Sequence, residues 1–126
     1  MPRDTAWCRG FLCGALSVVA ASASEQRAWL EKHDVGADEI ALDLEHAFGL
    51  ASQLVEEGAL SGESLADMGL IDTVFDGMAR DRSTDWWTVE ALADAPGWAR
   101  ARELAGRVLA REGVAGTALP DIQVIR

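Results

Sequence analysis

The sequence predicts an all-α protein: a single-domain bundle of five or six helices with a short extended arm at its C-terminal end. Apolar residues recur at intervals of three and four along most of the chain, as they do on the buried face of a helix. Glycines stand where these patterns stop, at Gly36, Gly58 and 113–116. The chain has 126 residues and is 49% hydrophobic, so it has the length of one domain and can build its own core.

The first helix is expected from about Asp4 to Ala21 and includes most of the stretch FLCGALSVVAASAS at 11–24. Its upstream arginines, apolar run and Ala-Ser-Ala sequence are typical of a secretory signal peptide. Two features favour a core helix of a cytoplasmic protein instead. Asp4 is acidic where a signal peptide is basic, and Ser22 with Glu25 can form the capping box of a second helix.

Three more helices are expected before residue 80. The second covers about 23–33 and carries Trp29 and Leu30. The third covers about 38–57 and the fourth about 62–79, where Ser61 can serve as N-cap. The third has an apolar stripe formed by Ile40, Leu44, Ala47, Phe48, Ala51, Leu54 and Val55.

In the last third of the chain, the sequence predicts two helices and an extended arm. The polar segment RDRSTDWW at 80–87 connects to a short helix, about 89–94, which Thr88 can cap. Pro96 suits the first turn of a final helix that ends near Arg111. The tail LPDIQVIR, 119–126, is β-branched and alternating, so we expect an extended arm. No run of 18 apolar residues occurs, so no membrane span is predicted.

Negative charge is the clearest functional feature of the sequence. The formal net charge is −10, which disfavours nucleic acids and anionic membranes as partners and suits a basic protein. Between His33 and Ala79 there is no lysine or arginine. This acidic block is either a solvated face that keeps the protein soluble or a docking face. The carboxylates predicted to bind a partner are Glu39, Asp43, Glu63, Asp67, Asp72 and Asp76.

Two further groups of side chains bear on partner binding. Trp86 and Trp87 either close the core or, for at least one ring, anchor an interface, because tryptophan is favoured at interface hot spots. Arg100, Arg107 and Arg111 share one face of the last helix. We expect them to pair with the acidic block, within the fold or across a homodimer.

No motif predicts catalysis, and the sequence indicates no catalytic, cofactor-binding or metal-binding residues. It lacks a nucleophile elbow and a phosphate-binding glycine loop. Asp43, His46 and Glu39 share a helix face, but di-metal bundles use such a motif twice. Cys8 and Cys13 are five residues apart, which places them on different helix faces, so they are expected to be unpaired. The chain is therefore expected not to be an enzyme, although the sequence alone leaves this open.

Three segments of the sequence are similar to those of known proteins: SEQRAWLEKH at 24–33, WWTVEALADAPGWARARELAGRVLA at 86–110 and LPDIQVIR at 119–126. In these the chain resembles a group of small, mostly uncharacterised acidic helical proteins of high-GC actinobacteria. In size and acidity it is also similar to immunity proteins that neutralise nuclease toxins. The resemblance implies a non-enzymatic protein-binding module of the immunity or antitoxin type. The alternative is a small enzyme or ligand-binding accessory protein of a biosynthetic pathway, with a Trp- and Met-lined pocket between helices.

Overall fold

The computed structural model describes residues 4–114 and 119, and this part of the chain contains six α-helices and no strand. The helices are α1 (Thr5–Ala20), α2 (Ala23–His33), α3 (Asp38–Glu56), α4 (Gly62–Arg80), α5 (Val89–Asp94) and α6 (Pro96–Arg111). The predicted all-α class and the position of every helix are confirmed. The arm predicted for 119–126 lies outside the described residues, apart from Leu119, which packs against the core.

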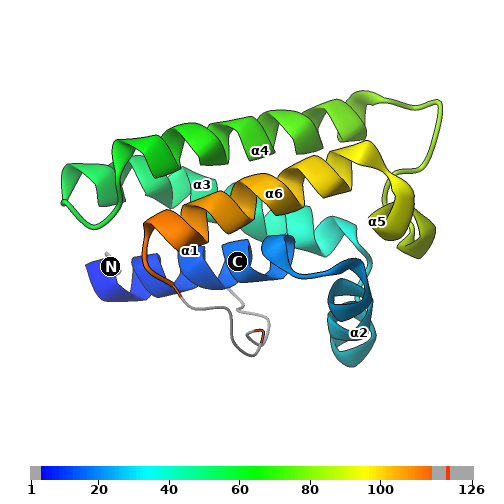
Figure 1. Ribbon diagram of the computed structural model, residues 1–126, viewed down its shortest axis with the longest axis horizontal. Helices are drawn as coiled ribbons and strands as arrows, with labels where there is room; N and C mark the ends of the chain where they lie inside the picture. The colour runs from blue at the N-terminus through cyan, green and yellow to red at the C-terminus, as the bar shows by residue number, and fades with distance from the viewer. Residues whose placement is uncertain (1–3, 115–118, 120–126) are drawn as a thin grey trace.

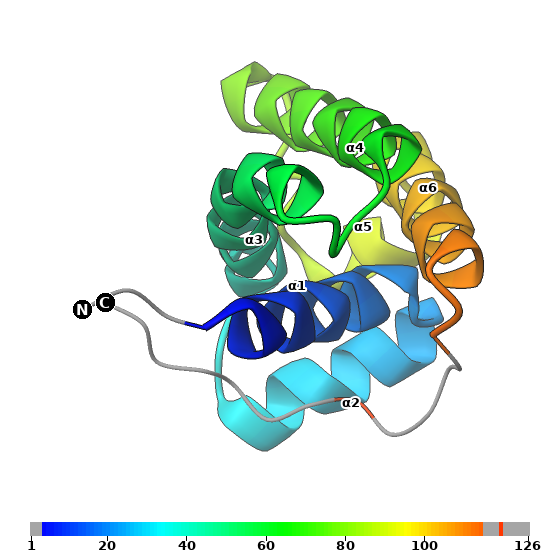
Figure 2. The ribbon, with the colours of Figure 1, turned by 90° about the vertical axis from the view of Figure 1, so that its left-hand side faces the viewer.

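Four helices form the body of the molecule. Figure 1 shows α1, α3, α4 and α6 along its long axis, with α2 and α5 together at one end. Each long helix packs on two others: α1 on α3 and α6, and α4 on α6 and α3. The end-on view in Figure 2 shows these four helices around a common centre, with α2 outside α1. None of the described helices combines the length and hydropathy needed to cross a bilayer.

Helix α1 belongs to the core, as its apolar pattern predicts. It buries six side chains, and Leu12, Leu16 and Val19 are fully inaccessible. Its N-cap is Asp4, whose carboxylate accepts a hydrogen bond from the backbone amide of Trp7 at 2.7 Å. The capping box predicted at the start of α2 is confirmed, since Ser22 and Glu25 exchange side-chain-to-backbone hydrogen bonds.

Side chains, rather than a glycine, close the C-terminal end of α1. The completely buried Gln26 of α2 donates from Nε2 to the carbonyl oxygens of Val18 and Val19, both at 3.0 Å. Arg102 of α6 donates to the carbonyl oxygen of Ala21 at 2.9 Å. Because the last carbonyls of a helix lack their usual partners within it, these bonds give donors to Val19 and Ala21 and a second donor to Val18, which also accepts from the amide of Ala21.

Arg102 joins three segments through its guanidinium. Besides Ala21, it donates to Oε1 of Gln26 at 2.9 Å and to the carbonyl oxygen of Leu92 at 3.0 Å. Partial burial of the guanidinium lowers the pKa of Arg102 from its ordinary value. Arg102 and Gln26 thus fix the end of α1 against α2, α5 and α6.

At the opposite end of the bundle, Glu112, which follows α6, connects the start of α4 with α1. Its carboxylate accepts hydrogen bonds from the Ser64 hydroxyl at 2.6 Å and the Ser61 amide at 3.3 Å, both at the start of α4. Arg9 of α1 lies 3.4 Å from the other oxygen. Burial would raise the pKa of Glu112, but these hydrogen bonds and the charge of Arg9 outweigh it and lower the pKa. A carboxylate at a helix N-terminus also interacts favourably with the helix dipole.

Candidate functional site

The structure divides the acidic block among three places. Asp67 and Glu63 face the arginines of α6. Asp72 and Asp76 line a groove between α3 and α4. Glu39 and Asp43 are not among the residues with which α3 lines the same groove, which are Asp38, Ala41, Leu42 and Glu45. The six predicted carboxylates therefore do not form one continuous face.

Asp67 corrects the prediction of an exposed partner-binding carboxylate. The residue is only 6% exposed, and its two oxygens each lie 2.9 Å from a guanidinium nitrogen, one of Arg107 and one of Arg111. Burial would raise its pKa, but the hydrogen bonds and charges of the two arginines lower it overall. Asp67 therefore holds α4 against α6 and is not available to a partner.

The groove between α3 and α4 is the site that best combines the predicted features. Its volume is about 370 Å³. The side chains that line it are Asp38, Ala41, Leu42 and Glu45 of α3, Asp72, Phe75, Asp76 and Ala79 of α4, and Trp87. Leu42 is 40% exposed, one of three large hydrophobic side chains exposed among the described residues. Carboxylates thus stand on both helices beside an apolar and aromatic surface.

Negative charge accumulates in this groove. The pKa of Asp72 is raised above its ordinary value, first by burial and then by the neighbouring charges of Glu45 and Asp76. Asp76 has a cation within reach, since Arg80 lies 2.8 Å from its carboxylate, but both side chains are largely exposed and such pairs contribute little. A positive group entering the groove would relieve the repulsion around Asp72.

Replacing Asp72 with asparagine is expected to raise the free energy of unfolding at neutral pH by about 0.5 kcal/mol, because it removes the cost of burying the ionised carboxylate and the like-charge repulsion from Glu45 and Asp76. A carboxyl whose pKa is raised by folding destabilises the fold when ionised. That cost is absent below the ordinary pKa of aspartate, near 4, and appears as the pH rises through the folded-state pKa. Urea denaturation at several pH values measures the gain, which should disappear in acid.

The control for this variant is Asp76→Asn, which removes a similar repulsion but also the ion pair with Arg80. Its expected change in unfolding free energy is close to zero. Equal stabilities of the wild type and Asp72→Asn at every pH would contradict the proposed charge accumulation.

Trp87 forms a fixed aromatic wall of the groove. Its ring centroid lies 6.0 Å from that of Phe75 and 5.8 Å from that of the fully buried Trp98, in a tilted and an edge-on arrangement. Its backbone amide donates to Asp85 at 3.0 Å. Trp87 therefore packs against the core, as one of the two sequence-based interpretations expects, and it also lines the groove.

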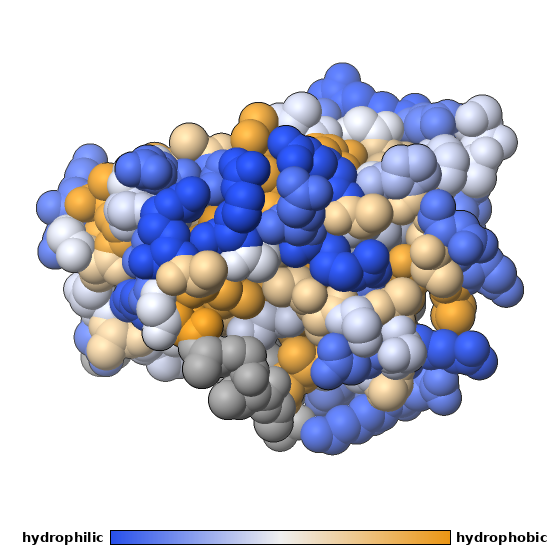
Figure 3. Space-filling model, viewed as in Figure 1, coloured by the Kyte–Doolittle hydropathy of each residue, from blue (hydrophilic) through white to orange (hydrophobic). Residues whose placement is uncertain are grey.

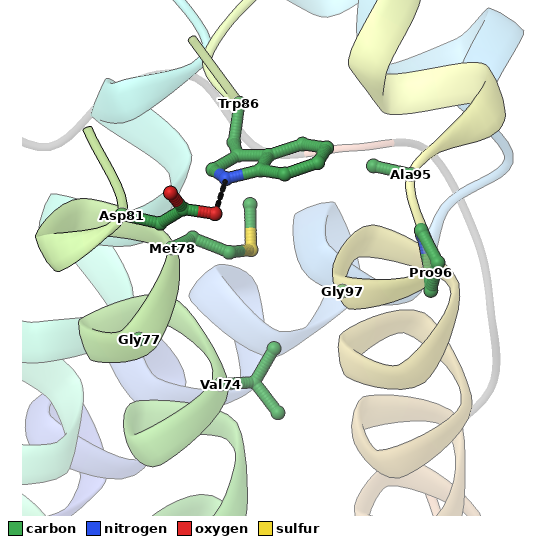
Figure 4. Close-up of a pocket in the computed structure, with 8 residues that line it drawn as sticks. All are labelled: Val74, Gly77, Met78, Asp81, Trp86, Ala95, Pro96 and Gly97. Carbon is green, nitrogen blue, oxygen red and sulfur yellow. Dashed lines mark hydrogen bonds between the residues drawn. The ribbon is translucent and has the colours of Figure 1, made fainter. Parts of the chain in front are cut away.

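Trp86 lies over a different hollow, between α4 and the start of α6. Figure 4 shows its indole extending over Met78 towards Ala95, with Val74 and Gly97 deeper between the helices. Its Nε1 donates to the carboxylate of Asp81 at 3.1 Å. The hollow has a volume of about 330 Å³, and Asp81 is its one charged lining residue. The two adjacent tryptophans thus serve neighbouring but separate hollows.

The arginines of α6 confirm one expectation and correct another. Arg107 and Arg111 pair with the acidic block within the fold, as expected. Arg100 does not, because it pairs with Glu103 of its own helix at 3.0 Å.

Figure 3 shows the face with α6 across its middle, where hydrophilic residues form a band. Arg102 escaped the sequence-based prediction, since its neighbours Ala101 and Glu103 do not indicate which carbonyl oxygens it will reach.

Histidines and cysteines assemble no site in the described part of the chain. No group of three or more histidine, cysteine, aspartate or glutamate side chains is placed there to hold a metal ion. The Nδ1 atom of His46 is buried without a hydrogen-bond partner. Cys8 and Cys13 are unpaired and half-buried, and burial raises the pKa of the Cys13 thiol, which disfavours the reactive thiolate.

The fold and the groove define a small acidic helical bundle with an acidic, aromatic hollow on one side. Comparison with known protein families, curated proteins and solved structures finds no match to this chain.

Proposed function

We propose that the protein is a non-enzymatic binding module that covers a basic surface of another protein. The observation that carries this proposal is the groove between α3 and α4, where four carboxylates from two helices surround the exposed Leu42 and the half-buried Trp87. A cationic side chain of a partner can lay its methylene groups on such a surface while its charge meets the carboxylates. Opposite charges across an interface also accelerate association.

The net charge of −10 supports the same function. It raises the encounter rate with a basic protein and repels nucleic acids and anionic membranes. The most concrete version is an immunity or antitoxin protein that binds a basic toxin domain in the cytoplasm. In that role α4 supplies Asp72 and Asp76, α3 supplies Asp38 and Glu45, and Trp87 supplies the aromatic anchor.

The test is affinity capture from the native host with a tagged wild-type protein and a groove variant, Glu45→Gln with Asp72→Asn. We expect the wild type to retain a basic protein, and raised salt to weaken this retention. The groove variant should lose it. The matched control is Glu39→Gln with Asp43→Asn, which makes the same charge change on α3 at residues that do not line the groove and should retain the partner.

Two results would contradict the proposal. One is retention by the groove variant equal to that of the wild type. The other is loss of the partner only in the control variant, which would place binding on the part of α3 outside the groove.

A second candidate function is binding of a small apolar molecule in the hollow beneath Trp86. Met78 and Trp86 line this space between α4 and α6, as the alternative sequence interpretation expects. Ligand sites usually combine an apolar pocket with several converging polar groups. Here Asp81 is the one charged lining group, and it already accepts hydrogen bonds from Trp86 and Ser83. The groove therefore supports protein binding better than the hollow supports ligand binding.

A further inference from the structure

The C-terminal end of α4 is surrounded by three adjoining hollows. The first is the groove described above, and the last is the Trp86 hollow. Between them lies a connecting hollow, lined by Met78, Ala79, Asp81, Arg82, Thr84, Asp85 and Trp87. It shares Ala79 and Trp87 with the groove, and Met78 and Asp81 with the Trp86 hollow. The three spaces therefore follow one another around the C-terminal end of α4, with the groove and the Trp86 hollow on opposite faces of that helix.

The number of carboxylates decreases from the groove to the Trp86 hollow. Four carboxylates and no cation line the groove. The connecting hollow holds two carboxylates and Arg82, and the Trp86 hollow holds the single carboxylate of Asp81. The remaining side chains around the Trp86 hollow are those of Val74, Met78, Trp86, Ala95 and Pro96, with two glycines. The groove suits a cation, and the Trp86 hollow suits an apolar group.

We propose that these hollows bind one segment of the basic partner, which places an arginine in the groove and an apolar side chain under Trp86. This inference rests on the proposed function. Arginine fits the groove because its flat guanidinium stacks on aromatic rings and donates hydrogen bonds from several edges. Trp87 offers such a ring, and carboxylates stand on both helices beside it. A leucine-sized side chain fits within the 330 Å³ of the Trp86 hollow.

Synthetic peptides test the proposal with the full-length protein. Each contains one arginine and one leucine, separated by one, two, three or four glycines. Nuclear magnetic resonance reports binding through the indole N–H signals of Trp86 and Trp87. We expect at least one peptide to bind about tenfold more tightly than its leucine-to-alanine counterpart, because burial of a leucine side chain contributes that much. Replacing the arginine with glutamine should abolish binding.

Two glycine variants locate the apolar contact. Gly77 lines the Trp86 hollow, and a Cβ atom there meets no atom within 4 Å, so Gly77→Leu has room to begin a side chain that competes for the hollow. Gly49 of α3 has the same open surroundings and lines none of the three hollows, so Gly49→Leu is the matched control. Both changes favour helix. Gly77→Leu should remove the tenfold gain from the peptide's leucine, and Gly49→Leu should keep it.

The possible failures are distinguishable. If arginine peptides bind but the leucine adds nothing, or if Gly77→Leu leaves its contribution intact, this inference is wrong and the proposed function stands. If a leucine peptide without arginine binds under Trp86 equally well, the hollow is a site for apolar ligands and this inference is again wrong. If no arginine peptide binds, both this inference and the groove as a cation site are wrong.

Discussion

Replacing Asp67 with asparagine is expected to lower the free energy of unfolding by about 3 kcal/mol at neutral pH. The carboxylate is buried and engages Arg107 and Arg111, each at 2.9 Å. An amide of the same size cannot neutralise the two guanidinium groups, and its NH₂ group would face donors where an acceptor is needed. Both arginines are partly exposed and can turn towards water, which limits the loss. Urea denaturation followed by circular dichroism measures it.

The control is Glu63→Gln, which removes a carboxylate from the same helix and near the same arginine. Glu63 is largely exposed and 3.7 Å from Arg111, so its expected effect is below about 0.5 kcal/mol. Because folding lowers the pKa of Asp67, its contribution is present above the ordinary aspartate pKa and is lost as the pH falls through the folded-state value. Equal effects of the two variants would show that Asp67 has no special role between α4 and α6.

Replacing Arg102 with methionine is expected to lower the free energy of unfolding by about 2–3 kcal/mol. The change keeps most of the apolar stem but leaves the carbonyl oxygens of Ala21 and Leu92, and Oε1 of Gln26, without their donors. Thermal unfolding and urea denaturation both report this loss. Hydrogen exchange of amides near the end of α1 should accelerate as well, because that end is no longer fixed to α6.

The matched control is Arg100→Met on the same helix. Arg100 pairs with Glu103, both side chains are about half exposed, and the pair spans three residues of one helix. Such pairs contribute a few tenths of a kcal/mol. A loss for Arg102→Met no greater than that for Arg100→Met would contradict the structural role of the Arg102 hydrogen bonds.

The helices could be predicted from the sequence because their causes are local. Apolar spacing, the Ser22 capping box and Pro96 at the start of α6 depend on residues within a turn or two of each other. The closure of α1 could not be predicted in this way. It depends on Gln26 and Arg102, which the chain brings together across 76 positions.

The site was predictable in composition but not in position. An absence of cations between His33 and Ala79 correctly indicates excess negative charge, yet it does not say which carboxylates an arginine from another helix will reach. Asp67 and Asp72 are five residues apart on α4, and they face different neighbours. Asp38 and Glu45 escaped the prediction for the same reason, since only the packing of α3 on α4 makes them part of a groove.

The packing of α1 on α6 has a consequence for synthesis on the ribosome. Helix α1 emerges first, but one of the two long helices that cover it is encoded last among the six. Until α6 has left the exit tunnel, the part of α1 that packs on α6 lacks its final cover. The nascent chain therefore passes through a stage that chaperones for apolar segments can bind, and the native core closes only after α6 has emerged.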